Sequence, residues 1–364
     1  MLELTGNVSS QPPGDPAAQP SGDPAAQRRI PQAALSGENF PVALRILPGT
    51  IRRHLLALYT YARYVDDLGD EPAQRPNREP ATDPFSEPAT DSPARPPVDP
   101  FSRPALDPFN EPAQDPASEP ARDPGGEPGG PGPYDDAATR SATLRRFEEE
   151  LRAMYDGVPP THPVLVGLAP TVADRRLPLE PLCRLIAANQ RDQVVHRYDT
   201  YADLVDYCRL SADPVGELVL HIFEAQSPRR IAQSNHICTA LQVIEHLQDV
   251  AEDYARGRIY LPQDDLARHG VTPADLAASY ASPALRAVIR VQAERASAAL
   301  DAGAPLVGTL HGWARLAVAG YVAGGRAALA ALSRSDHDPL ARVPRPTRAG
   351  TAGQWLKTLI VRPA

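Results

Sequence analysis

Apolar residues recur every three or four positions along much of this chain, the spacing that places them on one face of an α-helix. The apolar/polar alternation typical of strands is not sustained anywhere. Proline and glycine mark several expected helix ends, as at Pro72 and Gly157, and Pro214 is expected to kink its helix. The pattern predicts an all-α fold, one bundle of about ten helices around a central cavity. The main predicted helices cover 55–70, 138–155, 163–176, 179–195, 200–224, 227–254, 282–302 and 311–333, with a short amphipathic one at 355–360.

Two segments carry too few apolar residues to build a core. Residues 1–34 and 72–136 are dominated by Pro, Asp, Glu, Ala and Gly. Frequent proline blocks helices and sheet ladders, and low hydrophobicity leaves little burial to offset chain entropy. We therefore expect a disordered Pro-rich tail at 1–34 and a disordered Pro-rich insert at 72–136. One helical domain would comprise 35–71 and 137–345, followed at 346–364 by a C-terminal tail with a short amphipathic helix.

Charge and cysteine usage narrow the class of protein. The formal net charge is −8 and no basic stripe appears, so we expect no nucleic acid partner. The three cysteines have no paired spacing and lie in apolar helical surroundings, which indicates core residues in a reducing compartment. The N-terminus is polar and Pro-rich, unlike a signal peptide. Because Arg326 interrupts the most apolar stretch, 316–332, no run reaches the ~18 residues of a membrane span. We expect a cytoplasmic protein.

Two acidic turns lie far apart in the chain, Asp66-Asp67-Leu68-Gly69-Asp70 and Asp249-Val250-Ala251-Glu252-Asp253. Residues three or four apart are neighbours on a helix, so each turn gathers its carboxylates on one side, at a cost of about 0.2–0.5 kcal/mol per like-charged pair. Magnesium is commonly held by one or two carboxylates, with water and phosphate oxygens completing its shell. Either turn alone is more typical of an acidic solvated face. The two together predict a site for a diphosphate bound through magnesium.

Polar residues extend both turns along their helices. Tyr59 and Arg63 precede the first turn on the same helical face. Gln242 and Glu245 precede the second, inside a segment otherwise rich in Ile, Leu, Val and Ala. Such a helix is expected to be buried with its polar side towards a cavity, since buried polar groups need a ligand, a metal or water.

Two arginines and a tyrosine follow the second turn. Arg256, Arg258 and Tyr260 supply guanidinium groups and a phenol that suit diphosphate oxygens. The alternative for the arginines is a charged helix end that complements the helix dipole.

These motifs resemble the squalene and phytoene synthase family, the head-to-head trans-isoprenyl diphosphate synthases. The resemblance covers essentially the whole predicted helical domain. The matching stretches are Glu38–Pro41 with Leu47-Pro48, Tyr59–Asp70, Tyr207–Gly216 and Asp249–Pro262. The sequences of the last two stretches are most similar to the hydroxysqualene synthases of the bacterial hopanoid branch, often called simply squalene synthases.

The resemblance implies an isoprenoid-synthase-type bundle and a magnesium-dependent enzyme acting on a prenyl diphosphate. The reaction it implies is ionisation of presqualene diphosphate and capture of the cation by water, giving hydroxysqualene and diphosphate for hopanoid or squalene biosynthesis. By position in the motifs, the implied metal ligands are Asp66, Asp67, Asp70, Asp249 and Asp253. The implied catalytic set adds Tyr59 and Arg63 to these. The implied substrate-binding residues are Asn39, Phe40, Tyr207, Ser211, Val215, Gly216, Gln242, Glu245, Arg258 and Tyr260.

The chain departs from the family pattern beside the second motif. Glu245 stands where the family usually has Asn, which adds negative charge near a diphosphate. His246 and Leu247 stand where the family usually has aromatic residues. A structural role for His246 is favoured over a role as proton acceptor.

Three alternatives stay open. The first is a sister reaction, the condensation of two farnesyl or geranylgeranyl diphosphates to presqualene diphosphate, squalene or phytoene. The second is a non-catalytic isoprenoid-binding relative, for which Glu245 is the main argument. The third is an acidic helical scaffold, which would not need Tyr59 and Arg63 on the same helical face as the first acidic turn. A lipid substrate and product are also compatible with peripheral contact at the inner face of the membrane, and with association with other enzymes of the squalene or hopanoid pathway.

Overall fold

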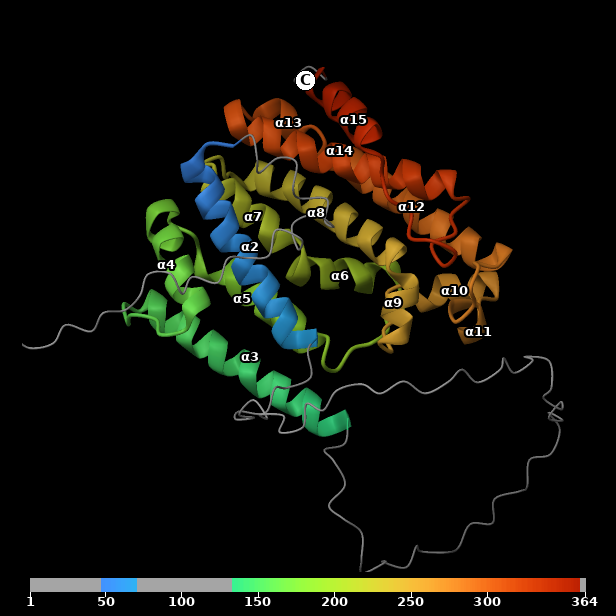
Figure 1. Ribbon diagram of the computed structural model, residues 1–364, viewed down its shortest axis with the longest axis horizontal. Helices are drawn as coiled ribbons and strands as arrows, with labels where there is room; N and C mark the ends of the chain where they lie inside the picture. The colour runs from blue at the N-terminus through green and yellow to red at the C-terminus, as the bar shows by residue number, and fades with distance from the viewer. Residues whose placement is uncertain (1–46, 71–132, 361–364) are drawn as a thin grey trace, which may run out of the picture.

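The computed structural model describes residues 47–70 and 133–360, and every regular element within these ranges is a helix (Figure 1). The only strand-type pairing in the described ranges is an isolated bridge between Arg197 and Ile259. The prediction of an all-α fold is therefore confirmed. The helices are α2 (Gly49–Asp70), α3 (Pro133–Tyr155), α4 (Pro163–Arg175), α5 (Leu179–Arg191), α6 (Tyr201–Ser211), α7 (Asp213–Ile222), α8 (Pro228–Gln248), α9 (Val250–Ala255), α10 (Gln263–His269), α11 (Pro273–Leu276), α12 (Pro283–Gly303), α13 (Leu306–Thr309), α14 (Gly312–Arg334) and α15 (Arg348–Ile360).

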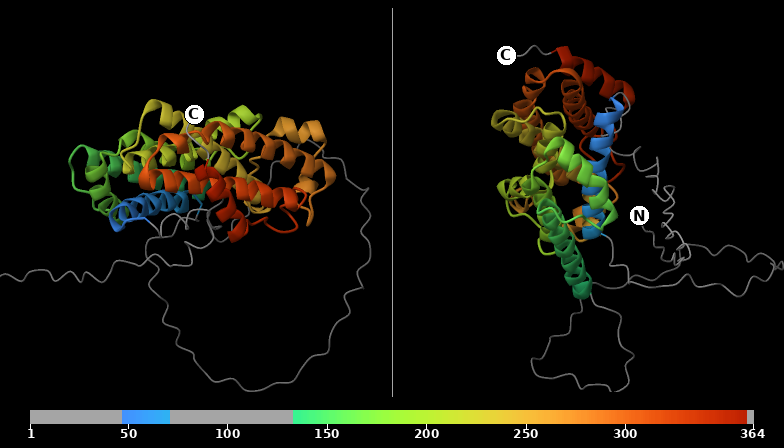
Figure 2. Two further views of the ribbon diagram at one scale, coloured as in Figure 1. Left: turned by 90° about the horizontal axis from the view of Figure 1, so that it is seen from above. Right: turned by 90° about the vertical axis from the view of Figure 1, so that its left-hand side faces the viewer.

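Helix α8 lies at the centre of the bundle. It packs most extensively against α12 and also contacts α7, α14 and α6. Its buried side chains include Ile237, Ala240, Val243 and Leu247, which point to different sides of the helix, as expected for a helix surrounded by others. Helix α2 packs with α3, α4 and α5 on the other side of α7 (Figure 1). Seen from above, the bundle is elongated, with α12 and α14 running along its length (Figure 2).

The helix predicted over 200–224 is two helices in the structure. Helix α6 ends at Ser211 and α7 begins at Asp213, with Ala212 at φ −118° and ψ −49° between them. Pro214 has no N–H to give to the Leu210 carbonyl, and its ring disfavours a continuous helix through this point. The expected kink is thus a break, and it turns the residues after Ser211 towards α8.

The helix predicted over 227–254 is also interrupted, at Asp249. This residue has φ −104° and ψ 14° and separates α8 from α9. Backbone bonds continue on both sides, from Asp249 N–H to the Glu245 carbonyl (3.0 Å) and from Asp253 N–H to the Asp249 carbonyl (2.8 Å). No proline or glycine marks this position, so the apolar pattern gave no sign of the break.

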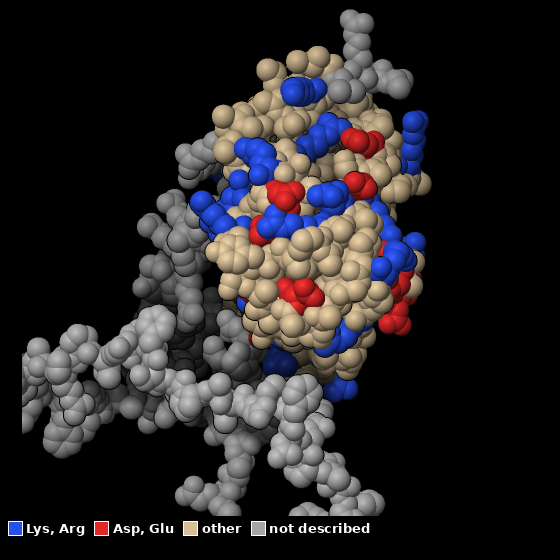
Figure 3. All heavy atoms as spheres, turned by 90° about the vertical axis from the view of Figure 1, so that its right-hand side faces the viewer, with Lys and Arg blue, Asp and Glu red and all other residues tan. Residues whose placement is uncertain are grey.

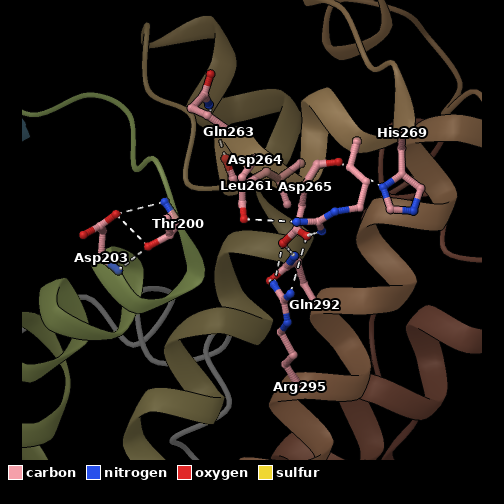
Figure 4. Close-up of polar contacts among 10 residues, drawn as sticks. Thr200, Asp203, Leu261, Gln263, Asp264, Asp265, His269, Gln292 and Arg295 are labelled. Atoms are coloured by element: carbon pink, nitrogen blue, oxygen red, sulfur yellow. Dashed lines mark hydrogen bonds and ion pairs between the residues drawn. The ribbon is translucent and has the colours of Figure 1, made fainter.

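A buried carboxylate fixes the segment that follows the second acidic turn. Asp265 is fully buried and accepts hydrogen bonds from Gln292 (2.7 Å), Arg295 and Arg268 (Figure 4). Burial alone would raise the pKa of Asp265, but the bonds from Arg295 and Gln292 hold it below its ordinary value. The segment is also tied to the loop before α6, where the Gln263 N–H donates to the Tyr198 carbonyl (2.9 Å). These bonds place residues 258–260 beside the bundle core.

Parts of the predicted organisation lie outside the described residues. These parts are the tail at 1–34 and almost all of the insert at 72–136. Within the described residues, α14 is long and apolar enough to cross a membrane by length and composition. Since 61% of that stretch is buried against the rest of the fold, it has the character of a core helix. The C-terminal helix is longer than the predicted 355–360 and packs on α14.

Candidate active site

A cavity of about 450 Å³ opens between α2, α7, α8, α14 and the segment 343–346. Along α8 its lining changes from Ser234 and Ile237 near the start to Glu245 and Asp249 at the end. Helix α2 shows the same change, from Leu55 and Leu58 to Arg63 and Asp66. The cavity therefore has an apolar part and a polar end, and the polar end is formed by both predicted motifs.

Asp66 is the residue of the first acidic turn that lines the cavity. Its side chain is exposed at the cavity surface. Desolvation by the surrounding protein atoms raises the pKa of Asp66 to about 7, and the nearby Asp70 and Glu245 act in the same direction. A hydrogen bond from Asn189 and the charge of Arg63 oppose the rise. A cation at this position would relieve the unfavourable charge.

Helix α5 holds the first acidic turn in place through residues that sequence reasoning missed. Asn189 Nδ2 donates to Asp66 Oδ1 (3.0 Å), and Gln193 Nε2 donates to the Gly69 carbonyl (3.0 Å). The helices approach so closely that a Cβ on Gly69 would lie 2.3 Å from Asn189 Oδ1. The available sequence signal was a polar run, Asn189-Gln190-Arg191-Asp192-Gln193, at the end of an otherwise apolar helix.

Gly69→Ala is expected to destabilise the protein although alanine is the better helix former. The added methyl group must displace Asn189 or push α2 from α5, and such overpacking costs about 1–3 kcal/mol. The melting temperature should fall by about 2–4 °C per kcal/mol. Gly167→Ala in α4 is the matched control, because its Cβ would meet nothing within 4 Å. If both variants melt at or above the wild-type temperature, the close approach of α2 and α5 is wrong.

The other two acids of the first turn are paired with arginines. Asp67 contacts Arg63 (3.1 Å) at a position where both side chains are about half exposed. Asp70 contacts Arg258 (2.7 Å) and Arg256 (3.5 Å), which follow the second acidic turn. Arg258 thus links the two motifs directly. The exposed Asp67–Arg63 pair contributes little stability, about 0–1 kcal/mol, so a diphosphate could compete for Arg63, whereas Arg258 is only 15% exposed.

The second acidic turn is divided by the break at Asp249. Asp249 lines the cavity, and desolvation together with the charges of Asp253 and Glu252 raises its pKa to about 6. Asp253 lies beyond the break and approaches His246 (3.8 Å). The prediction of one continuous polar stripe is therefore wrong at its end. Gln242, Glu245 and Asp249 line the cavity, whereas Asp253 lies against His246 behind it.

Tyr207 and Tyr260 meet at a buried carboxylate, Asp192, which the sequence did not single out. The Tyr207 hydroxyl donates to Asp192 Oδ2 (2.7 Å) and the Tyr260 hydroxyl to Oδ1 (3.4 Å). Burial raises the pKa of Asp192 to about 6, while the Tyr207 hydrogen bond and the Arg258 charge oppose the rise. The ring of His246 stacks on Tyr260 at 3.7 Å. Both tyrosines stand behind the cavity wall and support the second motif.

The predicted pocket helix supplies part of the apolar wall. Ser211, Val215 and Gly216 all line the cavity. A Cβ on Gly216 would lie 2.3 Å from Ser234 Oγ, so glycine is required for α7 to pack on α8. Ser211 Oγ is buried without a hydrogen-bond partner in the part of the chain that the structure describes. Asn39 and Phe40, also predicted to bind substrate, lie outside the described residues.

The segment between α14 and α15 borders the cavity, which sequence reasoning did not anticipate. Val343, Arg345 and Pro346 line the cavity together with Asp249. Gln248 Nε2 donates to the Pro344 carbonyl (2.6 Å) and holds this segment against the end of α8. Arg345 is exposed and adds a guanidinium group to the polar end. This part of the chain had been assigned to the domain end and a tail.

The donor set at the polar end suits magnesium. Asp66, Glu245 and Asp249 bring carboxylate oxygens to one cavity, and oxygens of this kind are the ligands that magnesium prefers. In the described ranges, no three His, Cys, Asp or Glu side chains lie close enough together to hold a metal ion by themselves. Magnesium usually keeps water and phosphate oxygens in its shell, so an open arrangement of this kind fits it.

Comparison with known proteins places this cavity in context. The chain is 34% identical over 208 residues to hydroxysqualene synthase of Zymomonas mobilis, a match that covers 56% of this chain and 69% of that protein. It is 33% identical over 172 residues to hydroxysqualene synthase of Rhodopseudomonas palustris, covering 47% and 57%. Phytoene synthase of Arthrospira platensis is 33% identical over 173 residues, covering 44% and 56%.

Two solved structures share the fold of this chain. The crystal structure of squalene synthase HpnC from Alicyclobacillus acidocaldarius superposes with a TM-score of 0.61 at 34% identity, covering 86% of this chain and 94% of that one. A dehydrosqualene synthase in complex with a ligand superposes with a TM-score of 0.66 at 18% identity, which supports the fold alone. The family model for squalene/phytoene synthase matches residues 33–119 and 132–349. The chain therefore belongs to the squalene/phytoene synthase family.

Proposed function

We propose that this enzyme ionises presqualene diphosphate and lets water capture the rearranged cation, giving hydroxysqualene and diphosphate. The observation that carries the proposal is the single cavity with carboxylates from both motifs at one end and an apolar wall beyond them. The similarity to two hydroxysqualene synthases supports this reaction.

The polar end would hold the diphosphate. Asp66 and Asp249, with Glu245 beside them, would bind Mg²⁺, and Asp67 and Asp70, on the same helical turn as Asp66, would join them when substrate binds. Bound there, Mg²⁺ would supply positive charge that neutralises the leaving group. Arg63, Arg258 and Arg345 would donate hydrogen bonds to the remaining phosphate oxygens. Substrate would release Asp70 from Arg258, a contact of 2.7 Å without ligand.

The apolar part would protect the cation. When the carbon–oxygen bond breaks, its electron pair leaves with the diphosphate and the prenyl chain becomes electron-deficient. Leu58, Val215, Val219 and Ile237 offer no nucleophile, so they prevent early capture by solvent. Finally a water oxygen bonds to the rearranged carbon and gives up one proton, for which the released diphosphate is the nearest strong base. Ser211 and Gln242 are two of the few polar side chains along this wall.

The reaction can be tested with purified protein, Mg²⁺ and two substrates offered separately. Hydroxysqualene should form from presqualene diphosphate without NADPH and should not form in EDTA. Formation of presqualene diphosphate or a hydrocarbon from farnesyl diphosphate would assign the enzyme to a sister reaction instead. If a folded protein converts neither substrate, the proposal fails and a binding role for this cavity is favoured.

A further inference from the structure

The C-terminal helix α15 has one face that packs on the bundle and one that does not. On the packed face, Trp355 Nε1 donates to the Leu316 carbonyl (3.1 Å) and Thr358 is 2% exposed. The Leu359 carbonyl accepts from Arg315 Nη2 (3.0 Å), which fixes the end of α15 beside the start of α14. On the opposite face, Leu356 is 61% exposed and Ile360 is 69% exposed. These residues are four apart and therefore adjacent on the helix surface.

Exposed apolar side chains are concentrated around this helix. Of the eight large hydrophobic residues that are exposed in the described ranges, four belong to it or to its neighbours. Trp313 is 40% exposed and lies two residues before Arg315, which contacts α15. Val343 is also 40% exposed and precedes α15 in the chain. We call Trp313, Leu356 and Ile360, which lie on α15 or beside its end, the C-terminal face.

The chain around the C-terminal face is basic, in contrast to the rest of the protein. Residues 339–364 contain five basic residues and no Asp or Glu, whereas the whole chain has a net charge of −8. They include the only lysine of the chain, Lys357, which is exposed beside Leu356. In the view from the right-hand side of Figure 1, Lys and Arg side chains lie over the upper half of the molecule with a few Asp and Glu among them, and further Lys and Arg lie lower down (Figure 3). Basic residues near an anionic lipid surface are attracted to its headgroups.

The same segment contributes to the cavity lining. Val343, Arg345 and Pro346 line the cavity, and α15 begins two residues after Pro346. No other stretch of the described chain combines exposed apolar residues, excess basic charge and contact with the cavity.

We propose that the C-terminal face docks on the surface of an anionic lipid bilayer. Leu356, Ile360 and Trp313 would insert into the boundary between headgroups and acyl chains, while Lys357 and Arg342 contact the acidic headgroups. Shallow insertion of a few side chains gives reversible binding, as for other interfacial helices. The inference does not depend on which prenyl diphosphate the cavity accepts.

The chain carries its own reporter for this surface. It has two tryptophans, Trp313 at the C-terminal face and Trp355 on the packed side of α15. Adding vesicles of phosphatidylcholine and phosphatidylglycerol to the full-length protein should shift tryptophan emission to shorter wavelength. The shift should be much smaller with phosphatidylcholine alone and should weaken at high salt, because the charge contribution is screened.

The double variant Leu356→Ser, Ile360→Ser should bind these vesicles at least about tenfold more weakly, since it removes most of the inserted apolar area. Lys357→Glu should weaken binding to anionic vesicles and leave the weak binding to phosphatidylcholine unchanged. Val166→Ser on α4 is the matched control, because Val166 is 50% exposed and far from this segment in the chain. Circular dichroism should be identical for all variants.

Three results would overturn the proposal. The first is the absence of a wild-type emission shift with anionic vesicles. The second is equal loss of binding in Val166→Ser and in the double variant. The third is a wild-type dimer that the double variant converts to monomer without any vesicle binding, which would assign the C-terminal face to a second copy of the chain. None of these measurements uses turnover, so they leave the proposed reaction unaffected.

Discussion

Asp66→Asn is expected to lower kcat by about a hundredfold to a thousandfold while the protein stays folded. Asp66 is the acid of the first turn that lines the cavity, and its substitution removes both a magnesium ligand and a negative charge. Loss of a group that stabilises developing charge commonly costs 10²–10³ in rate, about 2.7–4 kcal/mol. The free energy of unfolding should not fall. The change is isosteric, and it removes a carboxyl group whose pKa is raised to about 7 by desolvation.

Steady-state turnover of presqualene diphosphate at saturating Mg²⁺ measures this effect. Asp264→Asn is the matched control, an aspartate outside the cavity that pairs with Arg268. Asp249→Asn should lose a similar factor, and the double variant should lose less than the product of the two because both acids serve one bound diphosphate. A kcat within threefold of wild type for Asp66→Asn would contradict the role assigned to the cavity carboxylates.

The second large effect is a reversal of the pH dependence of stability when metal and pyrophosphate are added. In the metal-free fold the pKa of Asp66 is about 7 and that of Asp249 about 6, against 3.8 in an unfolded chain. A carboxyl whose folded pKa is raised gives stability that is fully present below pH 3.8 and is lost as the pH rises through the folded pKa. These groups should therefore weaken the metal-free protein between about pH 4 and pH 7.

Histidines act in the opposite direction over part of this range. Burial lowers the pKa of His54 and of His162, so their contribution rises with pH. Both wild type and Asp66→Asn contain these histidines, so the difference between their melting temperatures cancels the histidine contribution. In EDTA the variant should gain melting temperature over wild type as the pH is raised from about 5 to about 8.

Mg²⁺ with pyrophosphate should stabilise wild type more at the higher pH, because ligand carboxylates must be deprotonated to bind metal. A ligand at 100 times its Kd adds about 2.7 kcal/mol. The Asp66→Asn variant should lose most of this gain. Equal ligand-induced shifts at both pH values in wild type would mean that metal binds elsewhere.

The long helices could be predicted closely because their signal is local. The segments expected at 282–302 and 311–333 are α12 (Pro283–Gly303) and α14 (Gly312–Arg334), each displaced by one residue. Their apolar spacing specifies each helix without knowledge of the rest, and Ser282 with Pro283 marks the start of α12. The break at Asp249 had no such signal, since neither proline nor glycine stands there.

Part of the candidate site could also be predicted, because its residues fall on two helical stripes. Tyr59, Arg63 and Asp66 line the same cavity as Gln242, Glu245 and Asp249. Their chemical roles stay predictions. The residues that support the motifs could not be found in this way. Asn189 meets Asp66 across 123 positions of sequence, and no periodicity within α5 reveals such a partner.

Partners distant in sequence also explain why two tyrosines that were predicted to bind substrate do not face the cavity. Tyr207 and Tyr260 occur in the expected motifs, but their hydroxyls are directed to Asp192 and not into the cavity. Motif position fixes the place of a residue along the chain, whereas the direction of its side chain depends on partners that are distant in sequence, here Asp192.

The most direct test of the proposed reaction is turnover of presqualene diphosphate in water enriched in oxygen-18, with Mg²⁺ and without NADPH. Capture of the cation by water predicts hydroxysqualene that carries one oxygen-18 atom, with none of this product from Asp66→Asn. A hydrocarbon as the sole product, an unlabelled alcohol, or no turnover by folded wild-type protein would contradict the proposed function.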